Sequence, residues 1–207
     1  MHELVYNLVD KSSKVLDLGC ATGYFGKELA KKSVEIYGID VDQIALNHAR
    51  KYYKKVIQSD LNQLNTKILP KKYFDYVLLL DVIEHLIGAD QLLEKIFKLV
   101  NSNAKLIIST PNILHISVRF KFIFGKFTYE KYGILDETHV HFYTIQSLVQ
   151  LVTKMGYQVV KVIPAADLGQ VPFLGRFLRK ISPDVQNFFV KLAPNWLATQ
   201  FIVVCSL

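Results

Sequence analysis

Short apolar runs alternate with amphipathic stretches through the first half of the chain. Each apolar run is too short for a helix and rich in β-branched residues or leucine, so it predicts a strand. The run Tyr76–Leu80 is apolar throughout, as expected of a parallel strand covered on both faces. The predicted strands are residues 14–18, 34–39, 55–58, 76–80 and 105–109, and the helices between them are residues 24–32, 42–53 and 90–100. This alternation predicts a doubly wound α/β sheet with right-handed connections.

The second half of the chain has a different pattern. Residues 112–137 are rich in aromatic and basic residues without a clear period, and residues 164–197 form a second long excursion. We interpret both as insertions over or beside the active site. Around them the pattern predicts a helix at residues 144–155 and strands at residues 157–163 and 199–205. No linker or internal repeat is visible, so residues 1–207 are predicted to form a single domain.

The composition is that of a globular protein, with 51% hydrophobic and 21% charged residues. No apolar stretch approaches the ~18 residues that a membrane-spanning helix needs, and the first residues lack the pattern of a signal peptide. Cys20 and Cys205 both lie in apolar segments, which favours a reducing compartment over a disulfide framework. We therefore expect a cytoplasmic protein.

The net charge of the chain is +7. A positive balance favours anionic partners such as phosphorylated substrates, nucleic acid or acidic lipid, but an excess of basic residues for solubility explains it equally well. The charge therefore does not identify the reaction.

The first predicted strand runs directly into a turn of small residues, Gly19, Ala21 and Gly23. Small residues allow the backbone to turn sharply and to approach a ligand closely at the carboxyl edge of the sheet. Asp40 closes the second strand, where a carboxylate can accept hydrogen bonds from both ribose hydroxyls of an adenosine. Asp60 follows the third strand and is placed to accept from an adenine amino group. The strand ends therefore predict an adenosine-binding site.

Two kinds of cofactor compete for this turn. The spacing Ala21-x-Gly23-x-x-Gly26 can be aligned with the dinucleotide fingerprint, with alanine in place of its first glycine. Asp17 would then face a pyrophosphate, where negative charge is unfavourable. A methyl donor instead presents a cationic sulfonium and an ammonium group to the same region, so Asp17 favours the methyl donor.

Four segments of the chain resemble the successive motifs of class I S-adenosylmethionine-dependent methyltransferases. They are DLGCATGYFG at 17–26, GID at 38–40, SDL at 59–61 and LLLDVIEHL at 78–86. Over about residues 12–160 the chain is similar in particular to ubiquinone-biosynthesis O-methyltransferases and to small bacterial relatives. The resemblance implies a Rossmann-like sheet of seven strands, mostly parallel with an antiparallel last strand.

The resemblance also implies how S-adenosylmethionine would be held. The small-residue turn would lie near its methionine part, Asp40 at the ribose, and Val41 against the face of the adenine. Asp60 and Leu61 would meet the adenine edge. Ala21 stands where the family usually has glycine, which is a mild departure. The implied cofactor-binding residues are Asp17, Gly19, Ala21, Gly23, Asp40, Val41, Asp60, Leu61 and Asp81.

Methyl transfer is a displacement at a carbon that the positive sulfur already activates, so the protein must align donor and acceptor and manage the acceptor's proton. Two groups of polar residues are candidates for this work. Residues 81–85 follow the fourth strand, and a helical turn there would place the acids and the histidine on one face. Residues 137–141 follow the first insertion, and on an extended strand their two histidines would point the same way. The predicted catalytic residues are His85, His139 and His141.

Acids and histidines in this arrangement also suggest a divalent metal such as Mg, Mn or Zn, with Asp81, Glu84, His85 and His141 as its ligands. The pattern D-x-x-E-H, then S-T-P-N, then H-x-H-F-Y-T resembles metal-dependent methyltransferases of the terminal 2′-hydroxyl of small RNAs, which have glutamate in place of Asp81. A metal would bind both hydroxyls of a vicinal diol or catechol and lower the pKa of the acceptor. Two alternatives remain: Glu84 and His85 cap and orient the loop, or one histidine is a general base without metal.

Both insertions carry aromatic side chains beside basic ones. In residues 112–137 this mixture suits the binding of single-stranded nucleic acid, or a lid packed on the core. Residues 172–196 resemble an interfacial helix that would contact acidic lipid at the inner membrane face. The ordinary alternative for them is a helical hairpin packed on the sheet or at a dimer contact.

The sequence thus predicts a methyltransferase that modifies an oxygen of a small or lipid-linked hydroxylated acceptor, such as a phenol or a sugar. One alternative is an RNA 2′-O-methyltransferase with a divalent metal, although residues 112–137 contain no recognisable RNA-binding module. The other is a non-catalytic S-adenosylmethionine-binding partner subunit. In that case residues 81–85 and 139–141 would be far from the pocket or blocked.

Overall fold

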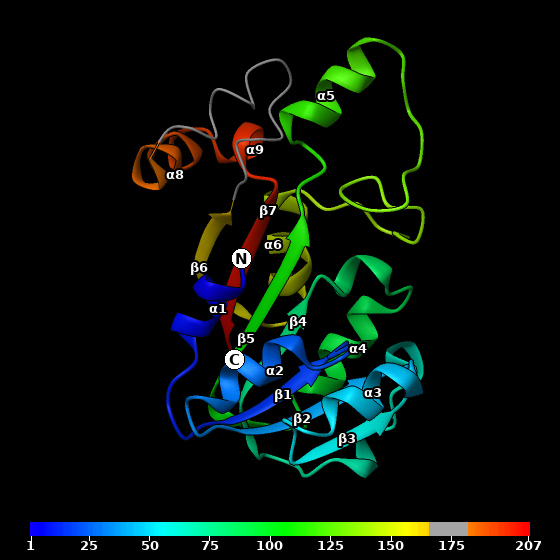
Figure 1. Cartoon of the computed structure of the whole chain (residues 1–207), viewed down its shortest axis with the longest axis vertical. Coiled ribbons are helices and arrows are strands. Elements are labelled where there is room, and N and C mark those ends of the chain that lie inside the picture. Colours follow the sequence, from blue (N-terminus) through cyan, green and yellow to red (C-terminus); the bar gives the residue numbers. More distant parts are fainter. Residues whose placement is uncertain (166–181) are drawn as a thin grey trace.

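The predicted strands form one mixed sheet in the order β3-β2-β1-β4-β5-β7-β6 (Figure 1). The protein is described by a computed structural model over residues 1–165 and 182–207. Neighbouring strands from β3 to β5 are parallel, and β7 is antiparallel to both β5 and β6. The predicted seven-stranded sheet with an antiparallel last strand is therefore confirmed. The strands are β1 (Lys14–Leu18), β2 (Glu35–Asp40), β3 (Lys55–Gln58), β4 (Phe74–Leu80), β5 (Val100–Pro111), β6 (Gln158–Ala165) and β7 (Gln200–Ser206).

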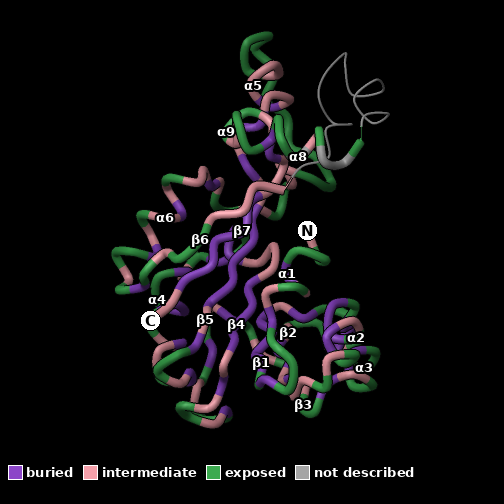
Figure 2. Tube along the Cα trace, turned by 90° about the vertical axis from the view of Figure 1, so that its left-hand side faces the viewer, coloured by how far each residue is buried: buried purple, intermediate pink, exposed green. Residues whose placement is uncertain are grey.

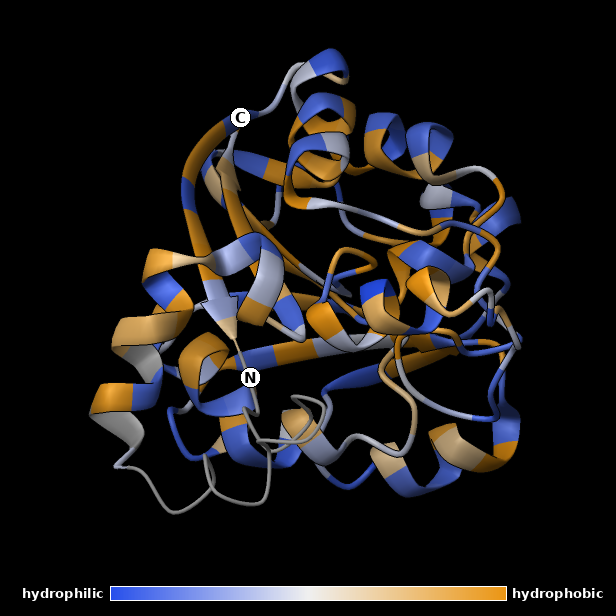
Figure 3. Ribbon diagram, turned by 90° about the horizontal axis from the view of Figure 1, so that it is seen from above, coloured by the Kyte–Doolittle hydropathy of each residue, from blue (hydrophilic) through white to orange (hydrophobic). Residues whose placement is uncertain are grey.

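Helices cover both faces of the sheet because alternate strand residues point to opposite sides. One face buries Leu16 against Leu93 and Val152, and the other buries Val15 against Leu29. The strands β4, β5 and β7 are buried along most of their length (Figure 2), whereas the helices mix hydrophobic and hydrophilic residues (Figure 3). The helices are α1 (His2–Leu8), α2 (Tyr24–Ala30), α3 (Gln43–Ala49), α4 (Ala89–Ile96), α5 (Ile116–Ile123), α6 (Ile145–Lys154), α8 (Pro183–Leu192) and α9 (Pro194–Leu197), with 3₁₀ turns η1 (Leu61–Gln63), η2 (Thr66–Ile68) and η3 (Ile83–His85).

Several element boundaries differ from the prediction. Asp42 caps α3, because its carboxylate accepts hydrogen bonds from the backbone N–H of Ile44 and Ala45 at 2.7 and 3.2 Å. The helix predicted to reach Val100 ends at Ile96, because Val100 already pairs with Phe74 in the sheet. The helix α5 in the first insertion had no clear periodicity in the sequence.

The second insertion is described in part. It leaves the sheet at the end of β6 and returns through α8 and α9 to β7. Residues 172–181 of the predicted interfacial helix lie outside the described residues. Among the residues that the structure describes, no helix is both long enough and apolar enough to cross a bilayer.

The sheet has a switch point between β1 and β4. The helix α2 that follows β1 packs on the face that buries Val15, and α4 that follows β4 packs on the face that buries Leu16. Because the chain leaves these neighbouring strands toward opposite faces, a crevice opens at their carboxyl ends. Ligands of doubly wound sheets bind in such a crevice.

Candidate active site

The turn after β1 follows a path that is closed to larger side chains. Gly19, Ala21 and Gly23 all have positive φ angles, of 78°, 44° and 77°. A Cβ atom on Gly19 would come within 2.4 Å of Val82 Cγ2, and one on Gly23 within 2.8 Å of the backbone of Ala49. Ala21 adopts the left-handed conformation that glycine enters without strain, which explains why glycine is usual at this place.

Asp40 ties this turn to the end of β2. One oxygen of its carboxylate accepts from the N–H of Ala21 at 2.7 Å, and the other accepts from the N–H of Asp42 at 2.9 Å. A carboxylate offers about four acceptor positions. Each oxygen of Asp40 can therefore accept one further hydrogen bond, as binding of the two ribose hydroxyls requires.

A cavity of about 310 Å³ lies at these strand ends. Its lining includes predicted cofactor residues that follow β1, β2, β3 and β4. The Val41 side chain is 66% exposed, so its apolar surface is free to receive a flat ring. The lining residues that the sequence predicted are Gly19, Asp40, Val41, Asp60, Leu61 and Asp81.

Asp17 has a different position from the one predicted. Its carboxylate is buried beneath the turn, where it accepts a hydrogen bond of 2.5 Å from the Tyr53 hydroxyl, and it lines neither this cavity nor the larger one described below. Burial raises the pKa of Asp17 to about 6, against the opposing effect of the Tyr53 hydrogen bond. Tyr53 also fills the space beside Gly26 and Gly38. Asp17 therefore supports the turn from below, and contact between it and the donor stays a prediction.

Asp81 stands at the end of β4 with a φ of 55°, which is an unfavourable conformation for a residue other than glycine. Its carboxylate accepts from the Ser109 hydroxyl and from the Gln200 amide, both at 2.8 Å. These two contacts fix the side chain at the edge of the 310 Å³ cavity. Gln200 is the first residue of β7, and nothing in its sequence context identified it.

A second cavity, of about 670 Å³, adjoins the first. Asp81 and His85 line both cavities. The acidic residues of the larger cavity are Glu3, Asp81, Glu84 and Asp136, and none of the described residues that line it is a lysine or arginine. The two cavities therefore meet at two of the residues that the sequence predicted, and the larger one is negatively charged.

Glu84 is the least solvated of these acids, with 1% of its surface exposed. Neither of its carboxylate oxygens has a hydrogen-bond partner in good geometry among the described residues, although the Thr110 hydroxyl lies close enough to oppose the effect of burial on its pKa. Burial raises the pKa of Glu84 to about 8. A buried carboxylate without a partner is costly, so this side chain is suited to hold a proton or to meet a cation.

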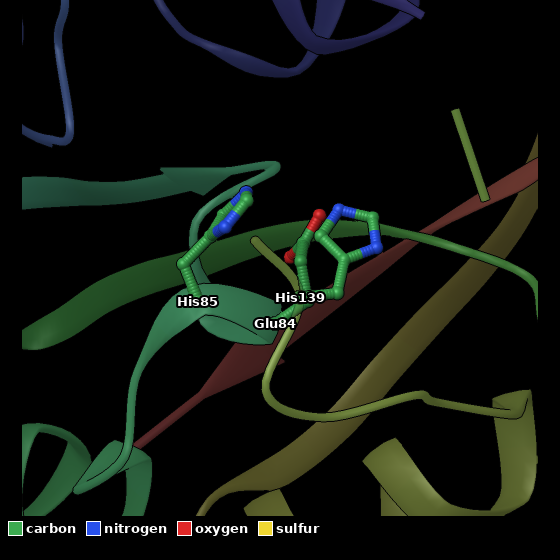
Figure 4. Close-up of side chains that lie close together, drawn as sticks. All are labelled: Glu84, His85 and His139. Atoms are coloured by element: carbon green, nitrogen blue, oxygen red, sulfur yellow. The ribbon is translucent and has the colours of Figure 1, made fainter. Parts of the chain in front are cut away.

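Two histidine rings lie beside Glu84 (Figure 4). The ring centroids of His85 and His139 are 4.8 Å apart, and potential ligand atoms of Glu84, His85 and His139 all lie within 4.8 Å of one another. The Nδ1 atom of His139 is 3.2 Å from the carbonyl oxygen of Ile134, and that of His85 is 3.1 Å from the carbonyl oxygen of Thr138. Since a carbonyl only accepts, each Nδ1 donates, which leaves each Nε2 as the acceptor or ligand.

The structure places His141 apart from the other two predicted histidines. Its side chain is exposed and lines a separate cavity with Asp90 and Tyr143, so the prediction that it points the same way as His139 is wrong. The chain is not extended there, because the N–H groups of Val140 and His141 both donate to the carbonyl oxygen of Glu84, at 2.9 and 3.0 Å.

The predicted metal-ligand set changes accordingly. His139 takes the place of His141, and Asp81 is outside the group because Ser109 and Gln200 hold its carboxylate. Burial lowers the pKa of His139, so its ring is neutral near pH 7, as both a general base and a metal ligand must be.

Comparisons with known proteins agree with this geometry. A sequence profile of the family described as "Methyltransferase domain" matches residues 2–162. A probable S-adenosylmethionine-dependent methyltransferase of Mycolicibacterium smegmatis is 28% identical over 163 residues, which cover 76% of this chain and 58% of that protein. A ubiquinone biosynthesis O-methyltransferase of Pelagibacter ubique is 29% identical over 107 residues, which cover 49% of this chain and 43% of that protein. The chain thus matches about half the length of these relatives.

Solved structures share the fold over the full length of the chain. The crystal structure of a SAM-dependent methyltransferase from Archaeoglobus fulgidus superimposes with a TM-score of 0.69 at 20% identity, covering 100% of this chain and 95% of that one. A possible histamine N-methyltransferase from Thermotoga maritima gives the same TM-score at 14% identity, covering 99% and 86%. At these identities the likeness concerns the fold alone.

Proposed function

Because this chain belongs to the methyltransferase domain family, we propose that it transfers a methyl group from S-adenosylmethionine to a hydroxyl oxygen of a small or lipid-linked acceptor. Family membership confirms the class I resemblance drawn from the four motifs, and S-adenosylmethionine is the donor that it implies. The observation that carries the proposal is the pair of adjoining cavities that share Asp81 and His85.

The smaller cavity is the proposed donor site. Asp40 accepts from the ribose hydroxyls, Val41 packs on the adenine, and Asp60 accepts from the adenine amino group. The methyl-bearing sulfur then faces the junction at Asp81, whose negative charge suits a sulfonium. The larger cavity receives the acceptor on the far side of that junction, which allows an in-line displacement.

The lining of the larger cavity limits the acceptor. Among the described residues, Glu3, Asp81 and Asp136 line it beside the protonated Glu84, and no lysine or arginine does, so a phosphate close to the reacting oxygen would be repelled. An uncharged phenol or sugar hydroxyl avoids this repulsion. His85 or His139, each with Nε2 free, accepts the proton that the hydroxyl loses on methylation.

We further propose that Glu84, His85 and His139 hold a divalent cation. A buried carboxylate without a hydrogen-bond partner beside two imidazole rings fits the ligands preferred by Zn²⁺ or Mn²⁺. Such a cation, when bound, would act as a Lewis acid that lowers the pKa of a coordinated hydroxyl. Without it, Glu84 in its protonated form and the two histidines still provide the acid and base groups.

The two alternative functions, a non-catalytic subunit and an RNA 2′-O-methyltransferase, fit this geometry less well. The non-catalytic subunit required residues 81–85 and 139–141 to lie far from the pocket, and its case is weakened because Asp81, His85 and His139 line cavities. An RNA 2′-hydroxyl acceptor is disfavoured because no lysine or arginine among the described lining residues is available to pair with the adjoining phosphates.

The donor step is tested by a thermal shift screen. We expect S-adenosylhomocysteine to raise the melting temperature with the logarithm of its concentration above its dissociation constant, and NAD to leave it unchanged. The acceptor step is tested with methyl-labelled S-adenosylmethionine and catechol, a simple phenol and a free sugar as probes. Label transfer to one of these and not to a short RNA supports the proposal, and transfer to RNA alone contradicts it.

The cation is tested with matched histidine variants. Added Mn²⁺ or Zn²⁺ should stabilise the chelator-treated protein, and His139→Gln should abolish this effect while His141→Gln retains it. The comparison is matched because the two histidines are two residues apart but line different cavities. Equal responses of both variants, or no response of the unmodified protein to any of the cations, would contradict the proposed site.

A further inference from the structure

Large apolar side chains are exposed together at one end of the molecule. They lie on α5, α8 and α9, which Figures 1 and 2 both show at the same end, and on the loop that follows α5 and leads from that end toward the sheet. We call this set the apical surface. It consists of Phe122, Ile123, Phe124, Phe127, Tyr129, Tyr132, Phe188, Phe189, Leu192 and Trp196, which are between 45% and 84% exposed. Single exposed apolar residues are common, but such a group marks an interaction site.

The apical surface has a defined structure. The rings of Phe122 and Phe127 stack at 5.6 Å, and Phe127 contacts Tyr129 edge-on at 5.2 Å. The guanidinium of Arg119 lies 4.0 Å from the centre of the Trp196 ring, which joins α5 to α9. Two segments that are far apart in the sequence are therefore held together as one face.

The charge around these side chains is positive. Residues 116–132 contain Arg119, Lys121, Lys126 and Lys131 against a single acid, Glu130. Glu130 already pairs with Lys121, so the exposed Lys126 and Lys131 have no acid of that segment to neutralise them. The surface thus combines apolar side chains with cations, while the larger cavity is lined by acids.

We propose that the apical surface docks on a lipid bilayer that contains anionic lipid. Aromatic and aliphatic side chains enter the boundary between head groups and acyl chains, and lysines pair with the anionic head groups. A symmetric dimer through this surface would bring the same lysines of two copies together, which is unfavourable. Ile123 and Leu192 cannot stack on bases, which distinguishes the surface from one built for single-stranded nucleic acid.

The position of the surface relative to the larger cavity is consistent with access from a membrane. The loop that carries Tyr129 and Tyr132 continues directly into Gly133, Ile134 and Asp136, which line that cavity. Docking would therefore bring the cavity close to the bilayer. The sequence predicted a membrane contact within residues 172–196. The surface that we propose adds α5 to that predicted contact, and the docking proposal does not depend on the chemistry of the reaction.

Trp196 provides a direct assay because it is the single tryptophan of the chain and lies within the surface. Vesicles of phosphatidylcholine with phosphatidylglycerol should shift its emission to shorter wavelength and carry the protein into the pellet on sedimentation. Pure phosphatidylcholine should bind it more weakly, and added salt should weaken binding to the anionic vesicles.

The double variant Ile123→Ser/Phe124→Ser should lower partitioning onto anionic vesicles roughly tenfold or more. Ile44→Ser on α3 is the matched control, because Ile44 is 73% exposed but lies outside the apical surface, and it should bind as the unmodified protein does. Lys126→Glu/Lys131→Glu should reduce binding to anionic vesicles and leave the weak binding to phosphatidylcholine. Unchanged melting temperatures establish that the variants are folded.

Several outcomes would overturn the proposal. One is vesicle binding that survives both double variants, and another is no emission shift with any vesicle. A dimer in sedimentation velocity that Ile123→Ser/Phe124→Ser dissociates, without vesicle binding, would identify an interface between copies. Binding of a single-stranded RNA that shifts Trp196 emission where vesicles do not would identify a nucleic-acid surface.

Discussion

The buried carboxyl group of Glu84 should make the stability of the metal-free protein fall as pH rises. Its pKa is about 8 in the fold against 4.5 for an exposed glutamate, because burial disfavours the charged form. Between these values the unfolded chain has released a proton that the folded chain keeps. The free energy of unfolding therefore falls by ~1.4 kcal/mol for each pH unit in this window.

The interval from pH 6.5 to pH 8 contains most of the titration of folded Glu84. The buried Asp17 also loses stability with rising pH, but its pKa of about 6 makes that effect small in this interval. The lowered pKa values of His2, His115 and His139 act with the opposite sign, and this gain continues for about one pH unit above the ordinary histidine value of 6.5, so only comparison with a Glu84 variant isolates Glu84. Glu84 alone should thus cost ~2 kcal/mol across the interval.

Urea denaturation of the chelator-treated protein at the two ends of this interval measures the effect. Glu84→Gln keeps the size of the side chain but cannot ionise, so its free energy of unfolding should lack the fall caused by Glu84 between pH 6.5 and pH 8. The comparison uses the difference in slope with pH, because a buried amide has a desolvation cost of its own and the histidines act equally in both proteins. Equal slopes for protein and variant would refute the reasoning.

Three further substitutions test other parts of the account. Asp40→Asn should weaken binding of S-adenosylhomocysteine about tenfold or more in calorimetry, because hydrogen bonds to a charged acceptor contribute ~1.5–3 kcal/mol. Unchanged affinity would exclude the assigned ribose contact. Gln200→Leu removes the hydrogen bond to one carboxylate oxygen of Asp81. The rate of methyl transfer should therefore fall, while the affinity for S-adenosylhomocysteine should change little. Equal rates of transfer by protein and variant would show that Gln200 does not position Asp81 for the reaction. Leu93→Ala opens a cavity at a fully buried residue under α4, so urea denaturation should show a loss of ~2–5 kcal/mol, and a loss well below that range would mean that the core there repacks.

Much of the fold could be predicted because its signals are local. The apolar runs that became β1, β3 and β4 depend on residues adjacent in the chain, and the cap of Asp42 depends on its next three residues. The turn after β1 could be predicted for the same reason, because its positive φ angles and the close approach of Val82 require small residues. Element ends were less predictable, as at Val100, because pairing with a distant strand decided them.

The active site was predictable only where sequence neighbours form it. Glu84 and His85 lie side by side in η3 and were both identified. Which of His139 and His141 lies beside Glu84 depends on a bend that two backbone hydrogen bonds to Glu84 impose. No sequence pattern predicts those hydrogen bonds. Gln200 and Glu3 come from opposite ends of the chain, so only the folded sheet brings them to the same cavity.

The central claim is that an S-adenosylmethionine site and an acceptor site meet at Asp81 and His85. A crystal structure with S-adenosylhomocysteine tests it most directly. The account predicts the ribose at Asp40, the adenine between Val41 and Leu61, and the sulfur directed past Asp81 into the larger cavity. An adenosine elsewhere on the sheet, or a sulfur that faces away from His85 and His139, would contradict it.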